Sequence, residues 1–147
     1  MNKEPQSTSK FPFLTDPGHI YNQLTKDGIT SVDVGWAKFT FVLGANLFDN
    51  GDELYGITLF DECLIKLDIN MPDYKAREII FHEIFHIILD NLGLDEMNFK
   101  GEFVSFPNEA LVVGVSKQFS TINRLNPGLL SLVMSPATPF PQPKKRK

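Results

Sequence analysis

The sequence has little of the material from which disulfides, metal clusters and membrane spans are built. It contains one cysteine and three histidines among 147 residues. A single cysteine excludes an internal disulfide framework and a zinc site made of several cysteines, and it is typical of a reducing compartment. No run approaches the roughly 18 consecutive apolar residues of a transmembrane helix, and residues 1–10 lack the apolar core of a secretory signal. We therefore expect a cytoplasmic protein with no membrane partner.

The composition is typical of one folded domain, because 42% of the residues are hydrophobic and 22% are charged. Fourteen basic and eighteen acidic residues give a net charge of −4, which argues against a general nucleic-acid binder. Residues 1–12 are interpreted as a flexible arm, and residues 135–147, which hold four prolines, as a disordered tail. The basic tip Lys144–Lys147 leaves only a weak possibility of nucleic-acid contact. The domain is expected to span residues 13–134, and its oligomeric state is not indicated.

The hydrophobic period changes once along this domain. Residues 29–69 favour strands, since β-branched and aromatic residues alternate with polar ones, as in Val32, Val34 and Trp36 or in Ile65, Leu67 and Ile69. From residue 72 the period is helical, which predicts helices over about 72–92 and 107–123 and a short helical turn over 128–133. Strands followed by helices indicate an α+β fold, in which helices pack on one face of a small sheet.

The predicted long helix carries His82–Glu83–Ile84–Phe85–His86, the pattern H-E-x-x-H. Residues four apart lie on the same face of a helix, so both imidazoles can reach one Zn²⁺. Glu83 flanks that face, where a carboxylate can take a proton from water that the metal activates. The motif lies among apolar residues, where polar side chains are costly unless they are paired or coordinate something. We therefore expect His82 and His86 to bind zinc and Glu83 to act as a general base.

A catalytic zinc site needs a third protein ligand and one open position. Glu109 is the preferred candidate, because a glutamate from the following helix would complete a His₂Glu set. The alternative interpretation is that Glu109 is an acid in the first turn of its helix, stabilised there by the helix dipole. Asp90 is a further candidate, more probable as a carboxylate that orients an imidazole than as a ligand. Glu102 and the remaining histidine, His19, stay open as well.

The segment from about Leu54 to Leu130 resembles the small zincin-type metallopeptidases of phages and mobile elements, akin to the ImmA/IrrE-type group. The resemblance is carried by the apolar pairs Ile79–Ile80 and Ile87–Ile88 around the motif and by Glu109–Ala110. It implies a minimal zincin-like fold, with a small sheet of about three to four strands packed on the active-site helix and on a second helix that bears the glutamate. It also implies His82, His86 and Glu109 as zinc ligands, with Glu83 as the general base.

Together these features predict a zinc metallopeptidase, which hydrolyses a peptide bond in a peptide or protein substrate. A phage-encoded enzyme of this kind would act in the cytoplasm of the host. The rival hypothesis is a non-catalytic zinc-binding module of a phage or mobile element that contacts another protein without cutting it. The two hypotheses differ in how the zinc is coordinated. A structural zinc is closed by four protein ligands, whereas a catalytic zinc keeps one position open.

Overall fold

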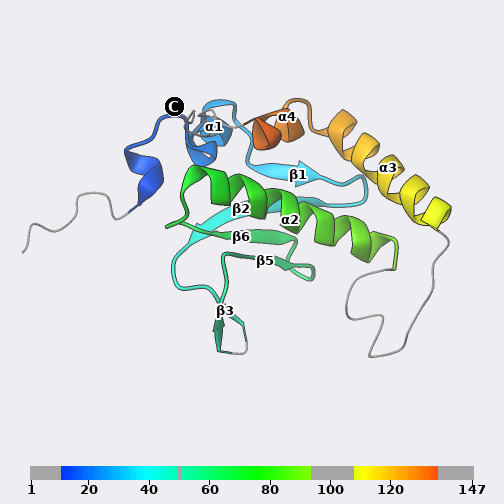
Figure 1. Cartoon of the computed structure of the whole chain (residues 1–147), viewed down its shortest axis with the longest axis horizontal. Helices are drawn as coiled ribbons and strands as arrows, with labels where there is room; N and C mark the ends of the chain where they lie inside the picture. The colour runs from blue at the N-terminus through cyan, green and yellow to red at the C-terminus, as the bar shows by residue number, and fades with distance from the viewer. Residues whose placement is uncertain (1–10, 50, 94–107, 136–147) are drawn as a thin grey trace, which may run out of the picture.

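The computed structural model describes residues 11–49, 51–93 and 108–135 (Figure 1). Residues 1–10 of the expected arm, most of the expected tail and the candidate ligand Glu102 lie outside the described residues. The elements in chain order are η1 (Pro12–Leu14), α1 (Ile20–Lys26), β1 (Ser31–Asp33), β2 (Lys38–Gly44), β3 (Phe48–Asp49), β4 (Asp52–Glu53), β5 (Gly56–Leu59), β6 (Leu64–Asp68), α2 (Asp73–Asn91), α3 (Asn108–Leu125) and α4 (Leu129–Met134).

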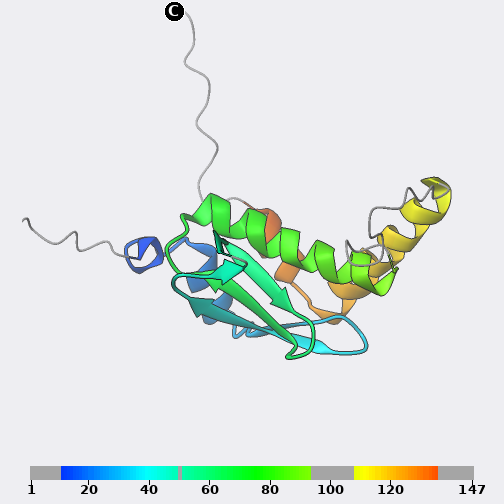
Figure 2. The same ribbon diagram turned by 90° about the horizontal axis from the view of Figure 1, so that it is seen from below.

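The main sheet has four strands in the order β1-β2-β6-β5. Strand β2 pairs antiparallel with β1 and parallel with β6, and β5 pairs antiparallel with β6. The short strands β3 and β4 form a separate hairpin, which turns at Gly51 with a φ of 85°. Helix α2 contacts β5 and β6, and α1, α3 and α4 contact α2 (Figure 2). The expected α+β class and the small sheet are confirmed.

The core lies between the sheet and α2, as the alternation in the sequence predicts. On β6, Ile65 and Leu67 are fully buried, and they are opposed by apolar residues of α2. Each such aliphatic side chain contributes about 1.5–3 kcal/mol when it leaves water. The buried isoleucines of α2 are Ile80, Ile84, Ile87 and Ile88. This packing fixes the rotation of α2 about its axis, and so decides which of its side chains face away from the core.

Simple strand alternation does not account for the exposure of two residues. Trp36 is 55% exposed, because β1 ends at Asp33 and the chain turns at Gly35, whose φ is 100°. Asp68, a polar residue that alternates with Leu67 and Ile69, is only 8% exposed, and its carboxylate accepts a hydrogen bond from the amide of Asn70. Strand alternation therefore predicts which side a residue takes, but turns and neighbouring loops change its exposure.

A buried arginine joins α2 to α4 and to the segment before α1. The Arg77 Nε donates to the Asp73 carboxylate at 2.9 Å, and Nη2 donates to the Gly18 carbonyl at 3.2 Å. Its Nη1 donates to the carbonyls of Leu132 and Ser135, at the end of α4. The last carbonyls of a helix have no partner within the helix. Arg77 supplies that partner and fixes the point at which the chain leaves α4.

Helix α1 was not predicted, because its seven residues follow a Pro–Gly segment that resembles a loop. His19 caps the helix through Nδ1, which accepts a hydrogen bond from the amide of Tyr21. The phenol of Tyr21 donates to the carbonyl of Asp68 at 2.7 Å. Burial, together with the nearby charge of Asp68, raises the pKa of the Tyr21 phenol well above its usual range. Helix α1 is thus held on the sheet by a buried polar cluster as well as by apolar contacts.

Candidate metal centre

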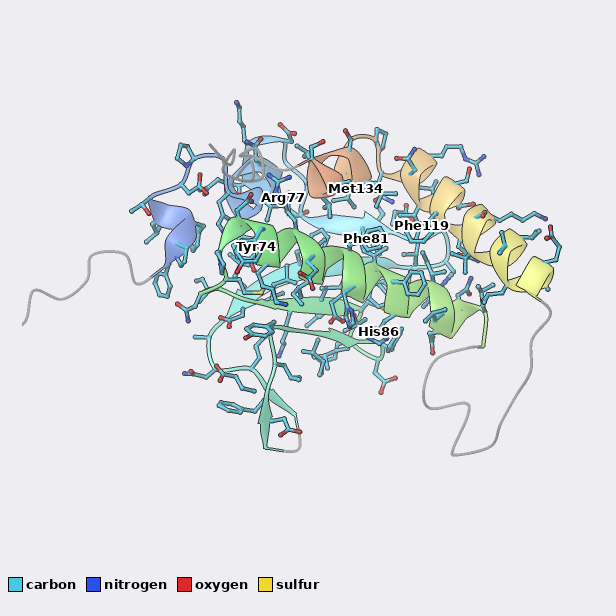
Figure 3. All side chains as sticks on the ribbon, in the orientation of Figure 1. Tyr74, Arg77, Phe81, His86, Phe119 and Met134 are labelled. Atoms are coloured by element: carbon cyan, nitrogen blue, oxygen red, sulfur yellow. The ribbon has the colours of Figure 1, made fainter. Side chains whose placement is uncertain are left out.

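The two histidines of the motif lie on the side of α2 that faces away from the core. His82 is exposed and His86 is half-buried. Phe81 and Phe85, about 100° away around the helix, pack instead against Phe119 of α3. Figure 3 shows His86 pointing toward the β5 side of α2, away from the side on which Phe81 meets Phe119.

The imidazoles face each other through the same ring atom. The Nε2 atoms of His82 and His86 are 3.1 Å apart, and the ring planes are inclined by 79°. Two nitrogens bound to one tetrahedral zinc at about 2.0–2.1 Å lie about 3.3–3.4 Å apart. The observed separation also suits a hydrogen bond between one protonated and one unprotonated nitrogen. The separation is thus compatible both with two ligands of one zinc and with a hydrogen bond between the two rings.

Glu83 lies on the flank of this pair, turned toward strand β5. Its side chain is buried, with the residue 5% exposed, and its Oε2 accepts a hydrogen bond of 2.6 Å from the hydroxyl of Thr58. A buried carboxylate needs such a partner, because the charged form is strongly disfavoured without one. Of the three polar residues of the motif, Glu83 alone is buried. Thr58 holds one carboxylate oxygen and so sets the orientation of the other.

Strand β5 can hold Glu83 because it lies unusually close to α2. A Cβ added at Gly56 would lie 2.6 Å from Ile79 Cγ2 and 3.5 Å from Glu83 Cγ. Gly56 and Thr58 are two residues apart and share the strand face toward the helix. The missing side chain at Gly56 therefore allows the close approach that brings the Thr58 hydroxyl to the carboxylate. Neither residue was predicted to belong to the site, although the alternation of strand faces was a signal in the sequence.

The structure does not bring Glu109 to the histidines. Glu109 is exposed in the first turn of α3. The amino-terminal end of that helix extends past the carboxyl end of α2 in Figures 1 and 2. Asp90 is half-buried in the last turn of α2. Within residues 11–49, 51–93 and 108–135, no three His, Cys, Asp or Glu side chains form a group that could hold a metal ion. A third ligand, whether Glu109 or Asp90, stays a prediction.

His19 is removed from the candidates by its own contacts. It is fully buried, with Nδ1 accepting from the Tyr21 amide and Nε2 at 2.8 Å from the carbonyl of Met71. A carbonyl only accepts hydrogen bonds, so Nε2 must carry the proton and Nδ1 must be the acceptor. Neither nitrogen has a lone pair left for a metal. His19 is therefore a structural residue.

Comparison of the chain with models of known protein families, with curated proteins and with solved structures gives no match. Within the described residues, no helix has both the length and the apolar character needed to cross a membrane.

Proposed function

We propose that this protein is a zinc-dependent peptidase, in which His82 and His86 bind the metal and Glu83 is the general base. The proposal is carried by one observation: two imidazole Nε2 atoms 3.1 Å apart, on a helix whose intervening residue Glu83 has a buried carboxylate that a neighbouring strand holds in place. Neutral imidazoles are usual zinc ligands in hydrolases, and Glu109 or Asp90 would have to supply the third ligand that completes the set. The residues also have the relative order that the H-E-x-x-H pattern requires.

Zinc bound at this pair would polarise a peptide carbonyl and acidify water. Glu83 is placed to take a proton from that water at its carboxylate and to give it to the departing amine. The Thr58 hydroxyl donates a hydrogen bond of 2.6 Å to Oε2, so the carboxylate is held toward β5 and does not rotate freely. Burial of Glu83 on the strand side limits competing hydrogen bonds from solvent.

A substrate peptide has a natural docking edge next to the motif. Among the described strands, β5 is at the edge of the main sheet and pairs with β6 on one side. An extended peptide can add to such an edge through main-chain hydrogen bonds. Because Thr58 of β5 contacts Glu83, a peptide on this edge would pass beside the proposed base.

We place the reaction in the cytoplasm, that of the host if a phage encodes the protein, where the free Cys63 stays reduced.

The second candidate is a non-catalytic zinc-binding module that contacts another protein. Its zinc would need four protein ligands, whereas the peptidase needs three, and Glu109 lies exposed in the first turn of α3. In the peptidase, Glu109 or Asp90 would supply the third ligand and leave one position open.

Metal analysis of the purified chain, prepared without chelators, tests the proposal. We expect one zinc per chain in the wild type, loss of zinc in His86→Ala, and retention of zinc in Glu83→Gln. The substitution His19→Gln is the matched control, because it changes the third histidine and should leave the zinc content unchanged. Glu109→Ala and Asp90→Asn then identify the third ligand: loss of a ligand abolishes stable binding, whereas loss of an orienting carboxylate weakens it by about 10–100-fold.

Hydrolysis is measured by mass spectrometry with an unfolded protein and a mixed peptide library as substrates. The peptidase predicts cleavage by the wild type and none by Glu83→Gln, although both bind zinc. A wild-type chain that neither carries zinc nor binds it on titration would refute both functions. A chain that binds zinc through four protein ligands and cleaves nothing would establish the interaction module.

A further inference from the structure

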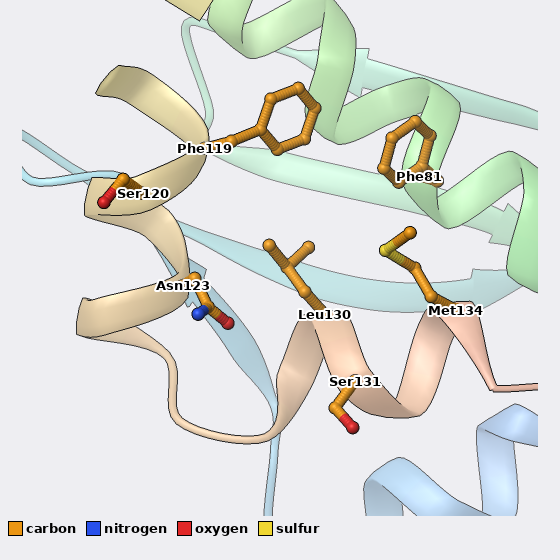
Figure 4. Close-up of a pocket in the computed structure, with 7 residues that line it drawn as sticks. All are labelled: Phe81, Phe119, Ser120, Asn123, Leu130, Ser131 and Met134. Atoms are coloured by element: carbon orange, nitrogen blue, oxygen red, sulfur yellow. The ribbon is translucent and has the colours of Figure 1, made fainter. Parts of the chain in front are cut away.

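A second feature, separate from the histidines, is an apolar groove of about 590 Å³ between α2, α3 and α4. Its residues are Phe81, Phe119, Ser120, Asn123, Leu130, Ser131 and Met134. Figure 4 shows Leu130 and Met134 extending from α4 toward the rings of Phe81 and Phe119. These rings stack with centroids 5.4 Å apart. Met134 remains 67% exposed, so one wall of the groove is incomplete.

The chain leaves α4 at this groove from a fixed point. Met134 is the last residue of α4, and the carbonyl of the next residue, Ser135, accepts a hydrogen bond from the buried Arg77. The residues that follow read Pro-Ala-Thr-Pro-Phe-Pro-Gln-Pro and then Lys144–Lys147. Phe140 is the only aromatic residue among them. It follows Ser135 by five residues, which span at most about 18 Å, so Phe140 cannot lie far from the groove beside Met134.

The chemistry of this segment complements the groove. Proline-rich peptides bind grooves lined by aromatic side chains, because the extended conformation is already favoured and loses little entropy. Prolines offer carbonyl acceptors without amide donors, and Ser120, Asn123 and Ser131 supply hydroxyl and amide donors around the groove. We propose that residues 136–147 dock in the groove of the same chain, with Phe140 against Phe81, Phe119 and Met134.

Because the segment is attached at Ser135, even a weak affinity for the groove is enough to keep the groove occupied most of the time. A short tether gives an effective concentration in the millimolar range. A groove that binds the free segment with a Kd of about 0.1 mM would then be occupied about ten times as often as it is empty. The proposal does not depend on zinc or on catalysis, and a failure of the proposed peptidase would leave it unchanged.

The test uses the full chain with methionine methyl groups labelled with carbon-13. The Met134 signal is assigned by its loss in Met134→Leu. We expect an NMR contact between this methyl group and an aromatic ring that disappears in Phe140→Ala, together with a changed shift of the Met134 signal. Oxidation of Met134 by peroxide should be about tenfold faster in Phe140→Ala than in the wild type, because the docked ring shields the sulfur. Met71, which is 2% exposed, serves as the internal reference.

Gln142→Ala is the matched control in the same segment, and it should leave both the signal and the oxidation rate near the wild-type values. An unchanged Met134 signal and an unchanged oxidation rate in Phe140→Ala would overturn the proposal. So would a Phe140-dependent signal that varies with protein concentration, because it would assign the contact to a second copy of the chain. Circular dichroism of each variant confirms that the fold is retained.

Discussion

One added methyl group at Gly56 tests the close contact between β5 and α2 on which the position of Glu83 depends. In Gly56→Ala the new Cβ would lie 2.6 Å from Ile79 Cγ2 and 3.3 Å from the carbonyl oxygen of Lys66. Separations below about 3.0 Å are not tolerated between such atoms, and the rigid strand and helix have little room to adjust. The strand and the helix must therefore move apart, and the hydrogen bond from Thr58 to Glu83 lengthens.

The expected cost follows from these two effects. Crowding of a packed core costs about 1–3 kcal/mol, and a weakened hydrogen bond to a buried charge adds up to about 3 kcal/mol. The lower entropy of alanine in the unfolded chain offsets about 0.5–1 kcal/mol. A net loss of about 2–4 kcal/mol corresponds to a fall in Tm of about 5–15 °C for a domain of this size.

Urea and thermal unfolding, followed by circular dichroism, measure the effect. Gly44→Ala is the matched control, because its Cβ would meet Leu47 Cδ2 at an ordinary distance of 3.4 Å, and we expect a change within about 0.5 kcal/mol. Ile79→Ala removes the obstructing Cγ2, so the double variant should be less destabilised than the sum of the single ones by about 1 kcal/mol or more. A Gly56→Ala protein as stable as Gly44→Ala, with additive effects in the double variant, would refute the reasoning.

Three further predictions concern buried polar groups. Thr58→Val leaves the Glu83 carboxylate without its donor and should cost about 1–3 kcal/mol in urea unfolding, whereas Thr58→Ser, which keeps the hydroxyl, should retain most of the stability. Because the pKa of Tyr21 is raised in the folded state, stability should be complete below about pH 10 and should then fall by up to about 1.4 kcal/mol per pH unit. Tyr21→Phe should remove that part of the fall above about pH 10, and equal slopes of the two proteins above pH 10 would contradict the assignment. Arg77→Leu removes the cationic partner of the Asp73 carboxylate and the side-chain donor to the carbonyls of Leu132 and Ser135, and it should lower the free energy of unfolding by about 3 kcal/mol or more, with only partial recovery in Arg77→Lys.

The sequence by itself determined the elements that have a long, regular pattern. The helical period after Pro72, with Gly93 beyond its end, predicted α2 within about one residue of Asp73–Asn91. The spacing of His82 and His86 likewise determined that they share one face, since four residues make slightly more than one turn. Both predictions depend on local geometry, which needs no knowledge of the rest of the chain.

Only the tertiary structure decided which partners these local elements meet. No sequence pattern pairs Thr58 with Glu83, 25 residues away, because the contact depends on the register of β5 and on the absence of a side chain at Gly56. From the sequence His19 stayed a candidate ligand. In the folded chain both of its ring nitrogens are used in hydrogen bonds, one with the Met71 carbonyl and one with the Tyr21 amide. The composition of the H-E-x-x-H motif is thus local and readable from the sequence, but the surroundings of each of its residues arise from contacts between distant segments, whose geometry the sequence pattern does not encode.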